Sequence, residues 1–241
     1  MGKGKPVIFL HGFLLDTEGW YGFQLDQCQF QSIYLDLPGH GINKQVALAQ
    51  QTIRAYAEWV HSVLSQLKIE NYSLVGHSMG GYIGLELLKL NPKLEKLILF
   101  HSNHWADSEE RKKNRDRVGK VVEKNARIFL SESIPFLFHE PEKYAKEVAE
   151  IIDRAAQMSP KQIIHAAQSM KNRPDMASVV QDFRDKCYFI QGEFDQVIDA
   201  NEARKTWAGL STHFYTIKQC GHMSHIEQPM MSTSLIQEIL K

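Results

Sequence analysis

Apolar residues in this chain fall into two alternating patterns. Short, continuously apolar runs predict strands, and they lie at residues 6–10, 32–37, 72–76, 94–100, 186–191 and 212–217. Longer stretches in which apolar residues recur every three or four positions predict helices, and these lie near residues 53–67, 83–90, 203–210 and 235–240. Strands that alternate with helices are typical of an α/β fold with a mostly parallel central sheet, here of about six strands flanked by helices.

The segment between the fourth and fifth predicted strands carries helical signals only. Asp107, followed three residues later by Glu110, resembles a capping box, and Ser159-Pro160 is a typical helix start. Pro174 is expected to end that helix. The sequence therefore predicts a core formed by residues 1–102 and 186–241, with an all-helical cap at 103–185.

Composition and charge narrow the class of protein. The 241 residues are 43% hydrophobic, and 28 Lys and Arg balance 28 Asp and Glu, so we expect no electrostatic binding of nucleic acid or anionic membranes. The three cysteines form no CxxC pair, and the apolar stretch near the start is too short for a signal peptide. These features predict a cytoplasmic protein with reduced thiols. The sequence carries no signal for an oligomeric state.

The clearest chemical motif is Gly76-His77-Ser78-Met79-Gly80, which joins the third predicted strand to a helix that is apolar on nearly every side. A serine on such a tight turn takes strained backbone angles, and side chains two positions before and after it would collide. Glycines at both of those positions remove the collision. The motif therefore predicts Ser78 as a nucleophile, with a helix N-terminus beside it.

A serine nucleophile needs a base and an acid that orients the base. His222 follows the sixth predicted strand, at the edge where a parallel sheet presents its functional groups, and we expect it to be the base, with His225 as the alternative. Asp195 follows the fifth strand and is the expected acid. Asp199 is better explained as a helix N-cap, because Glu202 lies three residues on.

The turn His11-Gly12-Phe13 ends the first predicted strand. A glycine there would let a backbone N–H face the serine. We therefore expect the N–H groups of Phe13 and Met79 to form an oxyanion hole.

Together these residues resemble the α/β-hydrolase superfamily over essentially the whole chain, with Ser78, Asp195 and His222 in that family's order. The resemblance also covers 35–41, Leu-Asp-Leu-Pro-Gly-His-Gly, a loop typical of small esterase-like members. It implies an α/β-hydrolase fold that lacks the usual first two strands before the oxyanion-loop strand.

Metal and nucleotide sites are not expected. His101 with His104, and His222 with His225, have helical spacing for paired ligands, but no HExxH motif is present and no carboxylate completes either set in sequence. Glycine-rich phosphate loops are absent too, so no cofactor is predicted.

Two further groups lie in the predicted cap. One is a basic group that begins at Arg111. Because acidic residues are interleaved with the basic ones, we interpret it as a solvent-exposed helix face; the alternative is that it attracts an anionic substrate or acyl carrier. The other is apolar, and its members either hold the cap to the core or line a substrate pocket. The residues expected to bind substrate are His11, Gly12, Trp105, Phe129, Phe136 and Phe138.

The sequence as a whole predicts a serine hydrolase of small carboxylic esters or thioesters, acting through an acyl-Ser78 intermediate. Cleavage of a carbon–carbon bond beside a ketone, or a lyase reaction, is the alternative on the same fold. A ligand receptor that kept the hydrolase shell is a further one. The expected partner is a small molecule only.

Overall fold

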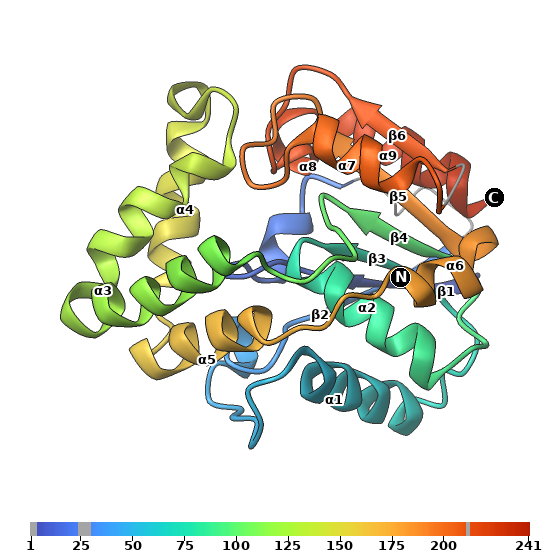
Figure 1. Ribbon diagram of the computed structural model, residues 1–241, viewed down its shortest axis with the longest axis horizontal. Helices are drawn as coiled ribbons and strands as arrows, with labels where there is room; N and C mark the ends of the chain where they lie inside the picture. Colours follow the sequence, from blue (N-terminus) through green and yellow to red (C-terminus); the bar gives the residue numbers. More distant parts are fainter. Residues whose placement is uncertain (1–3, 24–29, 211–212) are drawn as a thin grey trace.

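The computed structural model describes residues 4–23, 30–210 and 213–241. Within these residues six parallel strands form one sheet, as the sequence predicted, and their order in the sheet is β2-β1-β3-β4-β5-β6 (Figure 1). The strands are β1 (Lys5–Leu10), β2 (Phe30–Leu35), β3 (Ser73–His77), β4 (Leu97–Phe100), β5 (Cys187–Gly192) and β6 (Phe214–Ile217). The predicted strand ends differ by a few residues, and residue 212 lies outside the described part.

Alternate residues of each strand enter two hydrophobic cores, one on each face of the sheet. Ile8 and Leu10 of β1 join the core beneath α1 (Ile53–Gln66), α2 (Met79–Leu90), α6 (Ala177–Asp182) and α7 (Ala200–Trp207). Val7 and Phe9 join the other core, against η1 (Thr17–Trp20) and α9 (Pro229–Leu240). Both faces of the sheet are therefore covered, as parallel sheets require.

Helix α2 is the central helix that the sequence predicted. Ten of its residues, Met79 to Leu88, are buried in succession, and the helix packs against α1, β3 and β4. A helix without a polar face is stable only in such surroundings.

The chain between β4 and β5 is helical throughout and contains no strand in residues 101–186. Its elements are α3 (Glu109–Ser133), η4 (Pro135–Leu137), η5 (Pro141–Tyr144), α4 (Ala145–Ala155), α5 (Pro160–Lys171), α6 and η6 (Arg184–Lys186). Figure 1 shows α3, α4 and α5 beyond the carboxyl ends of the strands. The division into a core and a separate cap domain stays a prediction.

The start of α3 differs from the sequence prediction. Ser108, and not Asp107, is the N-cap, with its side chain accepting a hydrogen bond from the N–H of Arg111. The Asp107 carboxylate is buried instead in ion pairs with Arg115 and Arg173. At α5 the prediction is confirmed, because Ser159 and Gln162 form a capping box.

Helix α3 is bent at Asn125, whose φ of −159° and ψ of 96° are not helical. The Asn125 side chain accepts a hydrogen bond from the N–H of Ile128 and so caps the second half of the helix. The two halves of α3 can therefore face one cavity from different sides.

Two of the three cysteines, Cys187 and Cys220, are buried and reduced, as the sequence predicted; Cys28 lies outside the described residues. Burial raises the pKa of each of these two thiols to about 12. Among the described helices, none combines the length and the apolar character needed to cross a bilayer.

Candidate active site

Ser78 sits on a tight turn between β3 and α2. Its φ of 50° and ψ of −113° lie outside the regions that non-glycine residues ordinarily occupy. The turn is held by the Ser78 N–H, which donates to the Phe100 carbonyl at 3.0 Å, and by the Ser102 hydroxyl, which donates to the Ser78 carbonyl at 2.7 Å. Strain stabilised in this way is typical of a nucleophile elbow.

The glycines on either side of Ser78 are needed for steric reasons. A Cβ on Gly76 would lie 2.4 Å from the Gly80 carbonyl oxygen, and a Cβ on Gly80 would lie 2.4 Å from that of Leu10. Both partners are backbone atoms, so neither contact could be relieved by a side-chain movement. The collision that the motif predicted is confirmed at both positions.

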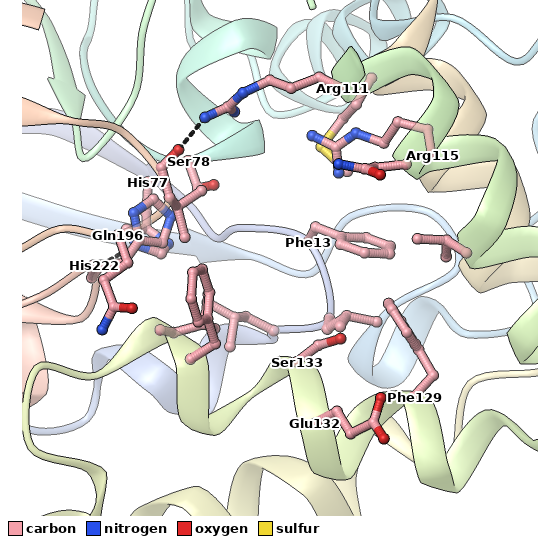
Figure 2. A pocket seen from close by; sticks show the side chains of 18 of the residues that line it. Phe13, His77, Ser78, Arg111, Arg115, Phe129, Glu132, Ser133, Gln196 and His222 are labelled. Carbon is pink, nitrogen blue, oxygen red and sulfur yellow. Dashed lines mark hydrogen bonds between the residues drawn. The ribbon is translucent and has the colours of Figure 1, made fainter. Parts of the chain in front are cut away.

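The loop after β1 lies directly beside Ser78. A Cβ on Gly12 would be 3.1 Å from the Ser78 Cβ, so the glycine allows this close approach. Phe13 follows at the cavity wall, and Met79 is the first residue of α2 (Figure 2). Within the described residues, the N–H groups of Phe13 and Met79 have no hydrogen-bond acceptor. Their availability fits the predicted oxyanion hole.

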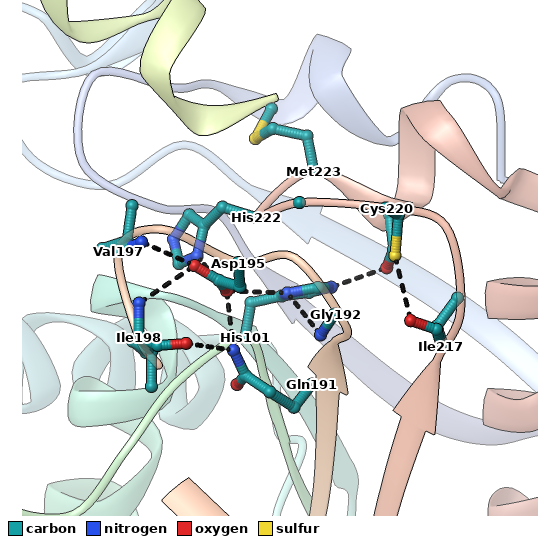
Figure 3. Close-up of polar contacts among 12 residues, drawn as sticks. His101, Gln191, Gly192, Asp195, Val197, Ile198, Ile217, Cys220, His222 and Met223 are labelled. Atoms are coloured by element: carbon teal, nitrogen blue, oxygen red, sulfur yellow. Dashed lines mark hydrogen bonds and ion pairs between the residues drawn. The ribbon is translucent and has the colours of Figure 1, made fainter. Parts of the chain in front are cut away.

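His222 and Asp195 are brought together from loops that follow β6 and β5. His222 Nδ1 lies 2.7 Å from Asp195 Oδ2 (Figure 3). An ionised carboxylate only accepts hydrogen bonds, so Nδ1 carries the proton and Nε2 is left as an acceptor. Ser78 and His222 line the same cavity (Figure 2).

The Asp195 carboxylate is buried and fully hydrogen-bonded. Oδ1 accepts the N–H groups of Val197 at 2.8 Å and Ile198 at 3.0 Å, and Oδ2 accepts the Gln191 amide at 2.8 Å. Burial alone would raise the pKa of Asp195, but the two imidazole rings of His222 and His101 more than offset this, and the pKa lies well below its ordinary value. Asp199, the alternative acid, is confirmed as the N-cap of α7.

Sequence reasoning missed His101, the second imidazole on Asp195. His101 Nδ1 lies 3.1 Å from Asp195 Oδ2, and Nε2 lies 2.6 Å from the Ser224 hydroxyl. The residue is fully buried, with an unusual φ of 48°. The available signal was the position of His101 directly after β4, because β4 ends at the same edge of the sheet as β5 and β6.

A carboxylate lies beside one histidine of each of the two pairs considered in the sequence. His101, Asp195 and His222 have possible ligand atoms that all lie within 4.8 Å of one another. The helical pairs considered in sequence do not form this set, because it takes one histidine from each pair. Direct hydrogen bonds to Asp195 occupy the facing atoms of both rings, which favours an interpretation without a metal.

Glu227, in α8 (Ser224–Glu227), fixes the backbone around His222. Its Oε2 accepts the N–H of Gly221 at 2.9 Å and that of Met223 at 3.3 Å, and its Oε1 accepts the N–H of His139 at 2.8 Å. The His222 N–H donates to the Leu137 carbonyl at 2.8 Å. The His222 loop is thus tied to the helical segment between β4 and β5, a link that sequence reasoning did not identify.

His225, the alternative base, is buried away from Asp195. Its ring packs against those of Trp20, His77 and Phe100. Burial, together with the positive charge that His101 and His222 could carry, lowers its pKa to about 3. His225 is therefore a neutral core residue at ordinary pH.

A cavity of about 540 Å³ opens above Ser78, a volume in the usual range of small-molecule sites. Phe129 and Phe136, two of the residues expected to bind substrate, line it. Most of the surface that lines it is apolar, although about half of the other lining residues are polar or charged. Most of these residues were not predicted: Phe13, Leu14, Leu15, His77, Ser78, Tyr82, Arg111, Asn114, Arg115, Val118, Glu132, Ser133, Leu137, Met170, Gln196, Val197 and His222.

Four predicted substrate-binding residues are not among the lining residues. Phe138 is buried inside the helical segment, stacked on Tyr144, and Trp105 packs beside His104 and Trp207. Gly12 lies behind the wall, against Ser78. The aromatic side chains of Phe138 and Trp105 are of a type suited to a pocket, but they are used in packing.

His11, the fourth of these residues, has a structural role. It is buried, its Nδ1 donates to the Gly12 carbonyl at 2.8 Å, and its Nε2 accepts the Leu37 N–H at 3.0 Å. His11 therefore joins the loop after β1 to the loop after β2, and it supports the backbone of the expected oxyanion hole.

Comparisons with known proteins agree with this architecture. A family model described as the alpha/beta hydrolase fold matches residues 5–229. The chain is 23% identical to a 2-succinyl-6-hydroxy-2,4-cyclohexadiene-1-carboxylate synthase of Enterobacter sp. (strain 638), over 99% of this chain and 94% of that protein. It is also 28% identical to a dihydrolipoyllysine-residue acetyltransferase component of the acetoin cleaving system of Pseudomonas putida, over 93% of this chain but only 60% of that protein.

Among solved structures, a thermophilic esterase from Thermogutta terrifontis is similar to the whole chain. The TM-score is 0.91 at 29% sequence identity, and the match covers 100% of this chain and 90% of the esterase. An enol-lactonase from Burkholderia xenovorans LB400 has a TM-score of 0.86 at 19% identity, over 99% of this chain and 92% of the lactonase, which shows likeness of fold.

Proposed function

The chain belongs to the family of the alpha/beta hydrolase fold, and on this premise we propose that it is a serine hydrolase of small carboxylic esters or thioesters. One observation carries the proposal: His222 donates to the buried Asp195 carboxylate at 2.7 Å, at the wall of the cavity that Ser78 also lines. The resulting imidazole has its free nitrogen available for the proton of a serine hydroxyl.

The proposed reaction has two halves. In the first, His222 Nε2 takes the Ser78 proton while Ser78 Oγ attacks the substrate carbonyl, and the N–H groups of Phe13 and Met79 stabilise the oxyanion. His222 then gives the proton to the leaving alcohol or thiol, which leaves an acyl-Ser78 intermediate. In the second half, water attacks this intermediate with His222 again as the base, and the acid is released.

Two features of the fold support this assignment of roles. The α2 N-terminus begins at Met79, so its partial positive charge lies where negative charge would develop on the substrate oxygen. The mostly apolar cavity lining would also exclude water from the ester, which strengthens each of these electrostatic interactions.

A second candidate function is carbon–carbon bond cleavage or a lyase reaction on a small ketone. The observation that favours it is the similarity, over 99% of this chain, to a relative that is named a synthase. In that reaction His222 would move the essential protons, and Ser78 would not form an acyl intermediate. A ligand receptor is a weaker alternative, because the hydrogen-bonded His222–Asp195 pair would then serve no purpose.

A fluorophosphonate probe tests the proposed nucleophile. We expect it to label the wild type and the exposed-site control Ser131→Ala, but not Ser78→Ala. An unlabelled wild type would contradict the proposal and favour the receptor. With short 4-nitrophenyl esters we expect a burst of 4-nitrophenol followed by steady turnover, whereas labelling without ester hydrolysis would favour the carbon–carbon enzyme.

A further inference from the structure

The cavity wall formed by the first half of α3 carries two guanidinium groups. Arg111 and Arg115 both line the cavity, and the Arg115 side chain is only 19% exposed. Figure 2 shows Arg111 directed from α3 toward the turn that carries Ser78. Arg117, on the same helix, is exposed and outside the cavity. The basic cluster predicted as a solvated face is therefore divided between solvent and the cavity.

The acidic groups nearby do not neutralise these arginines. Asp107 is shared between Arg173 at 2.7 Å and Arg115 at 3.1 Å, so one carboxylate faces two guanidinium groups. Arg111 Nη2 donates to a neutral acceptor, the Val197 carbonyl. Glu132, the one carboxylate among the lining residues, is exposed and lies across the cavity (Figure 2). Three guanidinium groups thus stand against two carboxylates.

Both lining arginines keep hydrogen-bond donors available. Among the described residues, Nε and Nη1 of Arg111 and both Nη atoms of Arg115 have no acceptor. None of these donor atoms is buried without a partner, so they are accessible from the cavity or from solvent. A guanidinium with two free N–H groups matches the two oxygens of a carboxylate.

We propose that Arg111 and Arg115 form a subsite for a carboxylate, so that the preferred substrate is an ester or thioester bearing a second, free carboxylate group. This inference rests on the proposed function for the scissile bond. Apolar residues that line the same cavity, such as Phe13 and Val118, would contact the chain that joins the two groups. A guanidinium charge that no carboxylate neutralises, at the wall of a largely apolar cavity, is stabilised by an anionic ligand.

A pair of esters with the same chain length tests the subsite. Mono-4-nitrophenyl adipate has a carboxylate where 4-nitrophenyl hexanoate has a terminal methyl, and the leaving groups are identical. We expect the wild type to have the higher kcat/KM for the adipate. Arg111→Met and Arg115→Met should each lower the adipate-to-hexanoate ratio of kcat/KM by about ten- to hundredfold, the usual effect of removing a charged hydrogen bond.

The ratio is the informative quantity, because Arg111→Met also removes the bond to Val197, next to the Asp195 loop. That change lowers kcat for both esters and cancels in the ratio. Arg111→Lys, which keeps the charge, should retain part of the preference. Arg117→Met, on the exposed side of α3, is the matched control and should leave the ratio unchanged. A wild type that prefers the hexanoate overturns the subsite and leaves ester hydrolysis intact.

Binding to the Ser78→Ala protein separates the subsite from catalysis. By isothermal titration calorimetry, this variant should bind monomethyl adipate at least tenfold more tightly than methyl hexanoate. The preference should be lost in Ser78→Ala/Arg111→Met, with Arg117→Met again as the control. Preferential binding without turnover in the wild type would refute the proposed hydrolysis and support the subsite. Equal affinities, or stronger competition by inorganic phosphate than by adipate, would overturn the carboxylate assignment.

Discussion

His101 and His222 lie against the same oxygen of one carboxylate: their Nδ1 atoms are 3.1 and 2.7 Å from Asp195 Oδ2. His222 faces the cavity, whereas His101 is buried behind Asp195 and is held by the Ser224 hydroxyl at 2.6 Å. Burial lowers the pKa of His101, so this ring is a neutral donor to Asp195. The arrangement makes His101 a positioning residue for the acid, and it leads to the first prediction.

Replacing His101 should change how kcat responds to pH. Without that donor the Asp195 carboxylate holds a protonated His222 ring more strongly, so the acidic limb of the kcat profile in His101→Ala should move to higher pH. We expect kcat to fall by about tenfold, the equivalent of one hydrogen bond, with little change in KM. His104→Phe, which alters a buried ring without contact to Asp195, is the control. A lower kcat with an unshifted profile would mean that His101 only supports packing.

Removing the charge of Asp195 should have a much larger effect. In Asp195→Asn the His222 ring no longer faces an anion and takes the wrong tautomer, so kcat for 4-nitrophenyl esters should fall by about 10⁴-fold. Fluorophosphonate labelling should slow in parallel. A loss of less than about tenfold would show that another group orients His222.

Glu227 should affect turnover without contacting substrate. Its carboxylate accepts the N–H groups on both sides of His222 and that of His139. Glu227→Ala leaves three backbone donors without an acceptor, two of them buried, so we expect kcat to fall by at least about tenfold. Glu227→Gln keeps one acceptor oxygen and should recover part of the loss, while the exposed Glu140→Gln should behave as wild type. Unchanged kcat in Glu227→Ala would contradict this positioning role.

His225 should make the protein less stable in mild acid. Burial lowers its pKa from 6.5 to about 3, so between these values the unfolded chain binds a proton that the folded chain does not. The free energy of unfolding therefore falls as pH falls through this window, by about 1.5 kcal/mol between pH 6.5 and pH 5 for one such group.

The variant His225→Phe tests that contribution. The apolar ring should keep contacts with Trp20 and Phe100 while removing the titrating group. Urea unfolding at the two pH values should give a smaller acid-induced loss of stability in the variant than in wild type. Equal losses would show that His225 is protonated in the folded protein.

Gly76→Ala should destabilise the fold, because the new Cβ would lie 2.4 Å from the Gly80 carbonyl oxygen. Overpacking against backbone costs about 1–3 kcal/mol or more. Gly209→Ala is the matched control, since a Cβ there meets nothing within 4 Å. The midpoint of thermal unfolding should be clearly lower for Gly76→Ala than for Gly209→Ala. Equal midpoints would contradict the steric explanation of the motif.

The sequence by itself determined the parallel sheet, the central buried helix and the turn that carries Ser78. These depend on local periodicity and on local sterics, such as the Gly76–Gly80 clash, which adjacent residues alone specify. It also indicated His222 and Asp195, because residues after parallel strands collect at one edge of the sheet.

The second imidazole on Asp195, the Glu227 contacts and the arginine wall were decided only by the tertiary structure. His101 and Asp195 are 94 positions apart, and no local pattern states which strand ends become neighbours or how loops then turn. The bend at Asn125 directs the two halves of α3 at one cavity, so both Arg111 and Phe129 line it, whereas Phe138, beyond the end of α3, is buried in packing. Residue type indicates what a side chain could do, but long-range packing determines what it faces.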